Sequence, residues 1–532
     1  MTKVWRIKER VSEDILEQLL INRGIKSEKE KEDFFNPQIE DYLKELEIPG
    51  IEKSLKRIQK AIDEGEQIVV FGDYDVDGIT ASAILYKALS SMGAKVLPYI
   101  PHREKEGYGL SKLGLEFSRD SGAAVVITVD NGIVAVDQAD FAKSIGLDLI
   151  ITDHHTLGIK KPEAFSIVHS TKMCGAAVAW CLIRDVVKKE LTQELLQFVA
   201  IATIADMMPL IGLNRALVAE GLKVLNKTDN LGLQTLFTES RIEKGNIKSF
   251  EVGHIIAPRI NAIGRLEHAI DALRLLCTKD PVKAKRLAKL LQDTNTKRQD
   301  LTMLAFEQAI EMAEKSLQKK INVLYHKDWH PGIIGLIAGR VTERYTKPTL
   351  AISVREGVSK GSARSITGLN ITEVLRSCSE FLVDVGGHAQ AAGFSVKTDR
   401  IEVFEQKIQE VISGMEITEA GEFLDIEAEV PVSKITKALA KKLDDFEPYG
   451  LQNPRPTLAT LNMKISDIRT LSNGKHLKFR AEGIDAIAFS MGELETFLQS
   501  GQLVNVAYNL EINKFNGNET LQLKVKDIQL NG

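Results

Sequence analysis

Short apolar runs alternate with helical segments from Gln67 to about Leu210, and this alternation constrains the fold more than any other feature of the sequence. Strands that alternate with helices of about 10–15 residues predict a doubly wound parallel sheet, so we expect an α/β unit here. The expected strands are Ile68–Phe71, Lys95–Ile100, Ala123–Val129, Leu147–Ile151 and Phe165–His169.

Acidic and imidazole side chains follow three of these runs. The carboxyl ends of parallel strands open on one edge of a sheet, where α/β proteins bind ligands, so we expect these side chains to converge. A further helical run, Leu195–Ile204, ends at an acid. Crowded carboxylates repel one another unless a cation lies between them. The residues are Asp73, Asp75, Asp77, Asp130, Asp153, His154, His155 and Asp206.

Each cluster also has a purely structural interpretation. The first is then an Asx turn and helix cap, and Asp130-Asn131-Gly132 is a strand-to-helix turn. Asp153 becomes a cap before two surface histidines, and Asp206 an ordinary helix end. The joint coincidence favours a pair of manganese or magnesium ions, which can activate water at a phosphorus centre.

The combined motifs resemble the DHH phosphoesterase superfamily. The longer stretches Gly72–Gly78 and Trp329–Gly335 are similar to its RecJ branch, the single-strand-specific 5′→3′ DNA exonucleases. The resemblance runs from about residue 15 to the last residue. It implies that the metal ligands are Asp75, Asp77, Asp130, His154 and Asp206.

The same resemblance implies roles for the neighbouring residues. Asp153 would orient His154, as a metal-bound histidine usually requires, and His155 would face the scissile phosphate. Asp73 would support the cluster. Phe71 stands where many superfamily members have histidine, so we expect one metal to have fewer protein ligands.

Two stretches are candidates for nucleic-acid contacts. Arg103 and Tyr108 offer a phosphate fork and a stacking face on one loop; the alternative is a solvated charged loop. The stretch Ala257–Leu266 is similar to a RecJ signature, and the alternative for it is a capping turn with solvated arginines. The resemblance implies that Arg103 grips the 5′-terminal phosphate or first nucleotide, and that DNA or the acidic centre is contacted by Arg259, Asn261 and Arg265.

A long helical pattern runs from Pro281 to about Lys319 and would span roughly 55–60 Å. We expect an inter-domain spacer, with Asn295 and Arg298 facing the gap between two domains.

A second, smaller α/β unit is expected from Asn322 to Ser413. Ser362 and Arg364 are two apart on an extended segment, hence on one face. Gly386-Gly387-His388 has the composition of a turn. The resemblance to the DHH-associated domain instead implies that Ser362, Arg364 and Gly387 bind the nucleotide and that His388 closes on it.

Short alternating runs from about Gly421 to the end predict an OB-like β-barrel with hairpins at Asn473-Gly474 and Asn516-Gly517. Basic and aromatic residues interleave here as in a strand-stacking platform; the alternative is a solvated face over an aromatic core. These residues are Lys475, His476, Lys478, Arg480, Phe489, Tyr508, Lys514 and Phe515.

The 532 residues divide into a helical segment (1–50), a DHH domain (51–215), a helical region with the long helix (216–320), a DHH-associated domain (321–415) and an OB-like domain (420–532). The 44% hydrophobic and 27% charged fractions are typical of a globular enzyme, and the net charge of −4 does not argue against a locally basic channel. Four scattered cysteines, a charged start and the lack of an apolar run of about 18 residues predict a cytoplasmic protein without a membrane span.

We therefore expect an exonuclease that acts on single-stranded DNA in repair and recombination, releases 5′-mononucleotides and works as a monomer. Helicase and single-strand-binding protein are candidate further partners. One alternative is a phosphodiesterase for short oligonucleotides or cyclic dinucleotides, for which the long helix and the barrel are superfluous. The other is a non-catalytic DNA-binding scaffold, which would be expected to have lost more ligands than the single change at Phe71.

Overall fold

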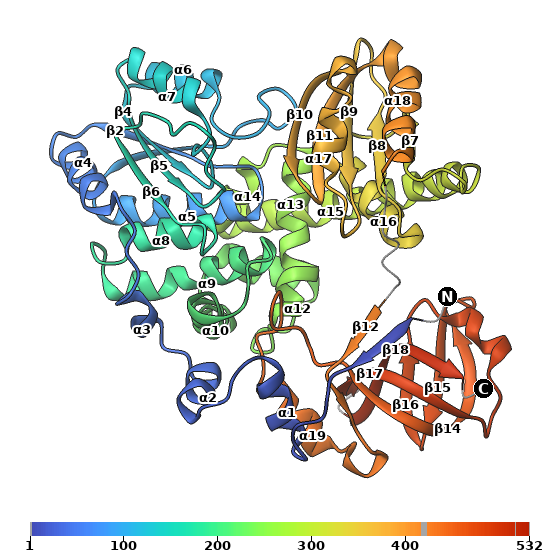
Figure 1. Ribbon diagram of the computed structural model, residues 1–532. Helices are drawn as coiled ribbons and strands as arrows, with labels where there is room; N and C mark the ends of the chain where they lie inside the picture. Colours follow the sequence, from blue (N-terminus) through green and yellow to red (C-terminus); the bar gives the residue numbers. More distant parts are fainter. Residues whose placement is uncertain (1–2, 416–422, 516–517, 531–532) are drawn as a thin grey trace.

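The protein is described by a computed structural model that places residues 3–415, 423–515 and 518–530. Two α/β units lie beside each other in the upper half of Figure 1, with helices between and below them. A β-barrel lies below the second unit. Among the placed residues, no helix is both long and apolar enough to cross a membrane.

The first α/β unit confirms the doubly wound sheet. Its five parallel strands have the order β3-β2-β4-β5-β6. The strands are β2 (Gln67–Phe71), β3 (Lys95–Tyr99), β4 (Ala123–Val129), β5 (Asp148–Asp153) and β6 (Ser166–His169).

Helices cover both faces of this sheet. Successive strand residues point to opposite sides, and the apolar side chains on each side are buried beneath a helix layer. Val69 and Phe71 pack on one side, beneath α6 (Lys112–Asp120) and α7 (Val136–Ser144). Ile68 and Val70 pack on the other side, in a core shared with α4, α5, α8 and α9. These four helices span Ile51–Asp63, Val76–Ser91, Gly175–Ile183 and Lys189–Ala205.

A helical region connects the two units. It contains α10 (Gly212–Asn226), α11 (Leu231–Ser240), α12 (Ser249–Glu251), the π-helix η1 (Val252–Ile256), α13 (Ala257–Leu266), α14 (Ile270–Cys277) and α15 (Pro281–Glu314). The long helix α15 ends at Glu314, earlier than the expected Lys319. Ala313 is its last buried residue, and Leu317 is exposed and gives no packing that would extend the helix.

The second α/β unit has a mixed five-stranded sheet in the order β10-β11-β9-β8-β7. Its strands are β7 (Asn322–His326), β8 (Thr349–Ser353), β9 (Val358–Arg364), β10 (Leu382–His388) and β11 (Ala391–Lys397), and its helices are α16 (Ile334–Tyr345), α17 (Ile371–Arg376) and α18 (Ile401–Ser413). The turn-like composition of Gly386-Gly387-His388 was misleading. These residues end strand β10, and His388 pairs with Ala391 of β11.

The C-terminal strands close into a barrel through pairing of β14 with β17. The strands are β13 (Ala428–Glu429), β14 (Leu458–Leu471), β15 (His476–Ala481), β16 (Ile484–Ala488), β17 (Leu503–Phe515) and β18 (Asn518–Leu530), with helix α19 (Lys437–Asp444) before β14. The predicted turn at Asn473-Gly474 joins β14 and β15 with positive φ at both residues. The second predicted turn, Asn516-Gly517, and the side chains of Lys514 and Phe515 lie outside the described residues.

Two predictions near the chain ends were wrong. The first segment is not wholly helical, because β1 (Val4–Ile7) pairs in parallel with β12 (Phe423–Ile426) before α1 (Ile15–Asn22), α2 (Glu28–Phe35) and α3 (Ile39–Leu43). Tyr508 is not part of a stacking surface. It is fully buried in the barrel core, and its hydroxyl hydrogen-bonds Thr460 at 2.9 Å.

Arg215 of α10 ties the barrel domain to the rest of the molecule. Its buried guanidinium donates to the carbonyls of Phe34, Phe446, Glu447 and Pro448 at 2.8–3.3 Å. It also lies 3.9 Å from the centre of the Phe34 ring. One side chain thus joins the N-terminal segment, the helical region and the loop that precedes β14.

Candidate metal centre and nucleic-acid interface

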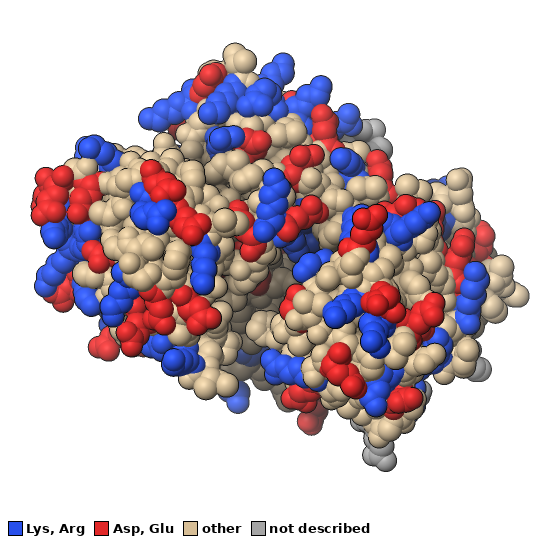
Figure 2. Space-filling model, turned by 90° about the horizontal axis from the view of Figure 1, so that it is seen from above, with Lys and Arg blue, Asp and Glu red and all other residues tan. Residues whose placement is uncertain are grey.

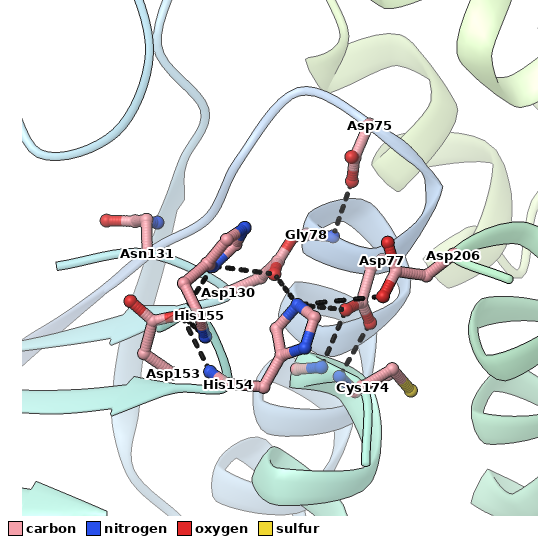
Figure 3. Close-up of polar contacts among 12 residues, drawn as sticks. Asp75, Asp77, Gly78, Asp130, Asn131, Asp153, His154, His155, Cys174 and Asp206 are labelled. Carbon is pink, nitrogen blue, oxygen red and sulfur yellow. Dashed lines mark hydrogen bonds and ion pairs between the residues drawn. The ribbon is translucent and has the colours of Figure 1, made fainter. Parts of the chain in front are cut away.

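The sheet edge gathers the predicted acidic and imidazole residues, as Figure 3 shows. Asp77 lies in the first turn of α5, and its carboxylate accepts hydrogen bonds from the amides of Gly175 (2.6 Å) and Ala176 (2.7 Å). These amides begin α8, whose positive end stabilises a negative charge. Two helix starts therefore fix Asp77 against the end of strand β4.

Asp130 occupies the centre of the cluster. Its backbone is left-handed (φ 62°), which turns the side chain from the end of β4 toward Asp77 and His154. A side chain at position 175 would clash with it, since a Cβ there would lie 2.7 Å from the Asp130 Cβ. Its Oδ1 is buried and accepts no hydrogen bond from any described residue. A buried, unpaired carboxylate oxygen is costly and fits a position reserved for a cation.

His154 faces three carboxylates at once. Its Nε2 lies 3.1 Å from Asp130 Oδ1, 3.5 Å from Asp77 Oδ2 and 3.7 Å from Asp206 Oδ2. Ligand atoms held about 2.1–2.2 Å from one cation are about 3.0–3.6 Å from one another, so the spacings to Asp130 and Asp77 suit a shared ion and that to Asp206 is slightly longer. Asp206 comes from the end of α9, as the sequence predicted, and its side chain is partly exposed.

A second group of close ligand atoms is formed by Asp73, Asp75 and Asp130. Asp75 caps α5 by accepting a hydrogen bond from the Gly78 amide at 3.1 Å, so the structural interpretation holds beside the metal one. Asp73 is buried, and among the described residues its Oδ1 has no hydrogen-bond partner. Phe71 supplies no ligand, because its ring packs in the apolar layer under α6, 4.9 Å from the Tyr99 ring.

Asp153 differs from the expectation. Its Oδ1 accepts from the Nδ1 of His155 at 2.7 Å, whereas from His154 it accepts only the backbone amide, also at 2.7 Å. Its Oδ2 accepts from the Ile133 amide. Asp153 therefore orients the ring of His155, and it fixes His154 only through the main chain.

Burial and mutual repulsion shift the pKa values of the acids in this cluster. Burial, followed by the nearby charge of Asp75, raises the pKa of Asp77 to about 7. Burial, with the charge of Asp77 next, raises the pKa of Asp206 to about 8, and burial likewise raises the pKa of Asp130 well above its ordinary value. Burial lowers the pKa of His154 to about 4, which leaves its imidazole neutral and able to bind a metal.

Aromatic rings and an arginine border the cluster. The hydroxyl of Tyr108 lies 3.0 Å from His155 Nε2, and the Tyr108 ring is 53% exposed. Tyr74 packs edge-on against Tyr108, and the Arg103 guanidinium lies 4.8 Å from the centre of the Tyr74 ring. The structure thus places Arg103 and Tyr108 at the acidic centre.

Helix α13 lies between this centre and the second α/β unit. Asn261 Oδ1 accepts from the amide of Val76, the first residue of α5, at 3.1 Å. Gly264 packs so closely that a Cβ there would lie 2.2 Å from the Tyr74 carbonyl oxygen. On the far side, Arg265 donates to the Gly332 carbonyl at 3.1 Å. The signature stretch is therefore a helix that contacts both units, and the capping-turn alternative was wrong.

Guanidinium groups of several elements converge in this gap. Burial lowers the pKa of Arg265 to about 10, and the positive charges of Arg103, Arg298 and Arg364 add to the effect. Arg298 has an unpaired, buried Nε among the described residues, and Asn295 has an unpaired Oδ1. Asn295 is 1% exposed, and its place at the gap between the two domains stays a prediction. Arg259 is held by Gln292 and by the Ile255 carbonyl.

The second unit contributes one face of its sheet. Arg364 donates to Ser362 Oγ at 3.1 Å, and Gly335 at the start of α16 leaves room for both. Residues aligned across the strands share a face, so Gly386 and Gly393 lie beside Ser362, and His388 lies two strands from Arg364. A Cβ at either of these glycines would meet no atom within 4 Å. Gly387 needs its glycine, because its φ is 143° and a Cβ would lie 2.4 Å from the Ala391 carbonyl. His388 is exposed.

The surface is hollowed between the two α/β units when seen from above, with both basic and acidic side chains around the hollow (Figure 2). Sequence reasoning missed Tyr74 and the amides of Gly175 and Ala176. The small residues Gly175 and Ala176 at the start of the apolar helix α8 could have indicated that another part of the chain packs closely against this helix end. Tyr74 gave no such sign, because its position within the acidic motif drew attention only to the carboxylates.

Known families cover most of the chain. Family models match as the DHH family N-terminal domain (residues 67–203), the DHHA1 domain (318–414) and the RecJ OB domain (426–527). The chain is 33% identical to the single-stranded-DNA-specific exonuclease RecJ of Bacillus subtilis (strain 168), over 96% of this chain and 67% of that protein. Identity to the Escherichia coli (strain K12) RecJ is 30%, over 97% of this chain and 95% of the relative.

The fold agrees with these matches. The crystal structure of RecJ in complex with Mn²⁺ from Thermus thermophilus superposes with a TM-score of 0.86 at 29% identity, over 99% of this chain and 80% of that one. The chain belongs to the RecJ family of single-stranded-DNA-specific exonucleases and is a metal-dependent nuclease.

Proposed function

We propose that the protein hydrolyses single-stranded DNA from the 5′ end with two Mn²⁺ or Mg²⁺ ions and releases 5′-mononucleotides. The observation that carries this proposal is the shared position of Asp130. It belongs both to the group around His154 and to the group with Asp73 and Asp75, so one carboxylate lies between two potential cation sites. The Thermus relative has solved structures with each of these metals.

The donor set fits hard divalent cations, which prefer carboxylate oxygens and accept imidazole. We assign Asp77, His154 and Asp206 to one ion and Asp75 to the other, with Asp130 between them. When bound, the two ions would supply an activated water and would stabilise charge on the phosphate oxygens. Asp73 remains close to the second ion as a supporting acid.

The chain's own residues would then hold and orient the substrate. His155, kept in place by Asp153 and near the Tyr108 hydroxyl, is positioned to donate to the scissile phosphate. Burial alone would lower the pKa of His155, but its hydrogen bond to Asp153 raises it, so the ring holds a proton more firmly. Phosphate binding is assigned to Arg103, Arg259, Arg265, Arg298, Ser362 and Arg364, and nucleotide contacts to Tyr108, Asn261, Asn295, Gly387 and His388.

Desolvated guanidiniums that repel one another gain most from phosphate, which supports a DNA strand in the gap between the α/β units. We take the 5′→3′ polarity and a role in DNA repair and recombination from the family resemblance. On the same basis we propose a monomer that works with helicase and single-strand-binding protein.

A gel assay tests this function. Single-stranded DNA labelled at its 3′ end should shorten progressively with Mn²⁺ or Mg²⁺, and a 5′ label should appear at once as a mononucleotide. Duplex DNA should stay intact. Loss of the 5′ label only after the strand has been degraded would overturn the polarity. If long strands stay whole while dinucleotides disappear, the protein is an oligonucleotide phosphodiesterase instead.

A further inference from the structure

Lys524 of the barrel lies between two aromatic rings from different domains. Its ammonium is 5.8 Å from the centre of the Phe250 ring on α12 and 5.7 Å from that of Phe489, which follows β16. A histidine lies beyond each ring, and we call these five side chains the row. His254 stacks on Phe250 at 4.4 Å with an angle of 17° between the rings, and His476 packs edge-on against Phe489 at 5.2 Å.

This row is not ordinary interdomain packing. Phe250 is 53% exposed and Phe489 is 47% exposed, so neither ring is covered by the contact that links the domains. The domains are joined by the buried Arg215 with its four carbonyl partners and by the ion pair of Lys248 with Asp444 at 3.1 Å, not by cover over either ring. Half-exposed aromatic rings contribute little to the hydrophobic core and often mark an interaction site. Next to a cation, they are suited to stacking with nucleic-acid bases.

The charge on this face is positive where the rings are. Lys478 and Arg480 project from the same face of the barrel, but both are paired with Asp485, at 3.7 Å and 3.2 Å. Lys524 has no carboxylate partner in the part of the chain that the structure describes. Its ammonium is therefore available to a phosphate between the two rings.

The row is connected to the catalytic loop by one continuous helix. Residues 249–266 run through α12, η1 and α13, and Figure 1 shows α13 above α12, nearer the two α/β units. Phe250 is at the barrel end, and Gly264 packs on Tyr74 at the other. The separation along the helix axis is about 20 Å, the length of roughly six stacked nucleotides.

We propose that Phe250, His254, Phe489 and His476 form a base-stacking subsite for the single strand, with Lys524 binding the phosphate between them, about six nucleotides from the reacting bond. The identity of the strand as substrate rests on the proposed function. The stacking subsite itself makes a separate claim about binding, which holds whether or not the strand is cut.

The test measures binding of oligothymidylate by fluorescence anisotropy, with EDTA present so that no cleavage occurs. Phe250→Ala and Phe489→Ala should each weaken binding of a strand of about 20 nucleotides by roughly 5- to 150-fold, the range for loss of one stacked base. Binding of a strand of about three nucleotides, too short to reach from the catalytic loop, should be unchanged. Phe250→Trp should restore binding and Phe250→Leu should not, because leucine keeps apolar area without a ring.

Two further measurements separate stacking from a structural effect. Phe497→Ala is the matched control, since this ring is 64% exposed in the same domain and outside the row, and it should bind as the unaltered protein does. Lys524→Gln should lower the slope of log affinity against log salt by about 0.7, the value for one phosphate of a single strand. A strand with abasic sites about six nucleotides from its 5′ end should bind Phe250→Ala and the unaltered protein equally.

Equal affinity of the long strand for Phe250→Ala, Phe489→Ala and the unaltered protein would overturn the subsite. An equal loss for long and short strands would also overturn it, because that pattern indicates damage to the core. Failure of the proposed nuclease function would instead appear as intact DNA with Mn²⁺. The binding comparison in EDTA would still test the subsite, because it does not depend on cleavage.

Discussion

The Nε2 atom of His154 lies 3.1 Å from Oδ1 of Asp130, an oxygen that is buried and accepts no hydrogen bond from the residues described. Both atoms point into the same space between the ends of β4 and β5. Burial disfavours the charged form of both groups. Neither side chain can therefore compensate the other by forming a stable ion pair. A divalent cation resolves this conflict, because it needs an ionised carboxylate and a neutral imidazole.

Asp130→Asn should abolish activity without unfolding the protein. Asparagine matches the shape of the side chain and tolerates the left-handed backbone, and it removes a charge that burial makes unfavourable. Activity should fall by more than the roughly 10- to 100-fold typical of residues that only orient a ligand. Thermal unfolding in EDTA should show a midpoint equal to or above that of the unaltered protein.

The matched control is Asp137→Asn, an exposed acid at the start of α7. It should keep both activity and the stabilisation given by Mn²⁺. A variant at Asp130 that still binds Mn²⁺ with undiminished affinity would show that this carboxylate is not a ligand.

The stabilisation given by Mn²⁺ should increase with pH. Asp77 and Asp206 have folded-state pKa values near 7 and 8, raised mainly by burial, above the ordinary unfolded value of about 3.9. The metal-free folded state therefore binds more protons than the unfolded chain between these values, and its stability falls as pH rises through them. Metal must displace these protons, so it binds better at high pH.

Differential scanning calorimetry at about pH 6 and pH 8.5, with EDTA or Mn²⁺, checks both signs. Without metal the midpoint should be lower at the higher pH, and the increase produced by Mn²⁺ should be larger there. An increase of equal size at both pH values would contradict the assignment of these acids to the metal site.

Asp153→Asn should act on His155 rather than on the metals. The carboxylate accepts from His155 Nδ1 and overcomes the effect of burial on its pKa, so its loss should lower the pKa of His155. We expect kcat to fall roughly 10- to 100-fold and, because His155 donates in its protonated form, the alkaline limb of the pH–rate profile to move to lower pH. Mn²⁺ affinity should change little. A large loss of Mn²⁺ affinity with an unmoved pH profile would restore the original prediction that Asp153 serves His154.

Gly264→Ala should disturb the catalytic loop from a neighbouring helix. The new methyl group would lie 2.2 Å from the Tyr74 carbonyl oxygen, so the loop or the helix must shift, at a cost of roughly 1–3 kcal/mol in the free energy of unfolding. Gly253→Ala in the same continuous helix is the control, because its nearest neighbour would be an Ile204 methyl at 3.6 Å. Urea unfolding should show it unchanged or slightly stabilised. Equal stability and activity of the two variants would mean that α13 does not position the loop.

The sequence predicted the fold where pattern and packing agree. The strands of the first sheet are buried on both faces, so their apolar runs were unmistakable, and the sheet edge then followed from topology alone. The prediction failed where a partner far along the chain decides the conformation. Val4–Ile7 is a strand only because Phe423–Ile426 lies beside it, and Gly386-Gly387-His388 is extended only because β11 pairs with it.

The acidic site was predictable for the same reason, since its residues stand at strand ends. What the sequence did not contain was the direction of each side chain. The hydrogen bond from His155 to Asp153, in place of His154, depends on ring rotation that spacing does not reveal. Tyr508, by contrast, was predictable as buried, because it alternates in phase with Val506 and Leu510, which are also buried.

Anomalous diffraction at the manganese edge, from crystals soaked in Mn²⁺, tests the central claim most directly. We predict two peaks within about 4 Å of each other, one bounded by Asp77, His154 and Asp206 and the other by Asp75, with Asp130 contacting both. A single peak, or peaks that these side chains do not surround, would contradict the two-metal centre.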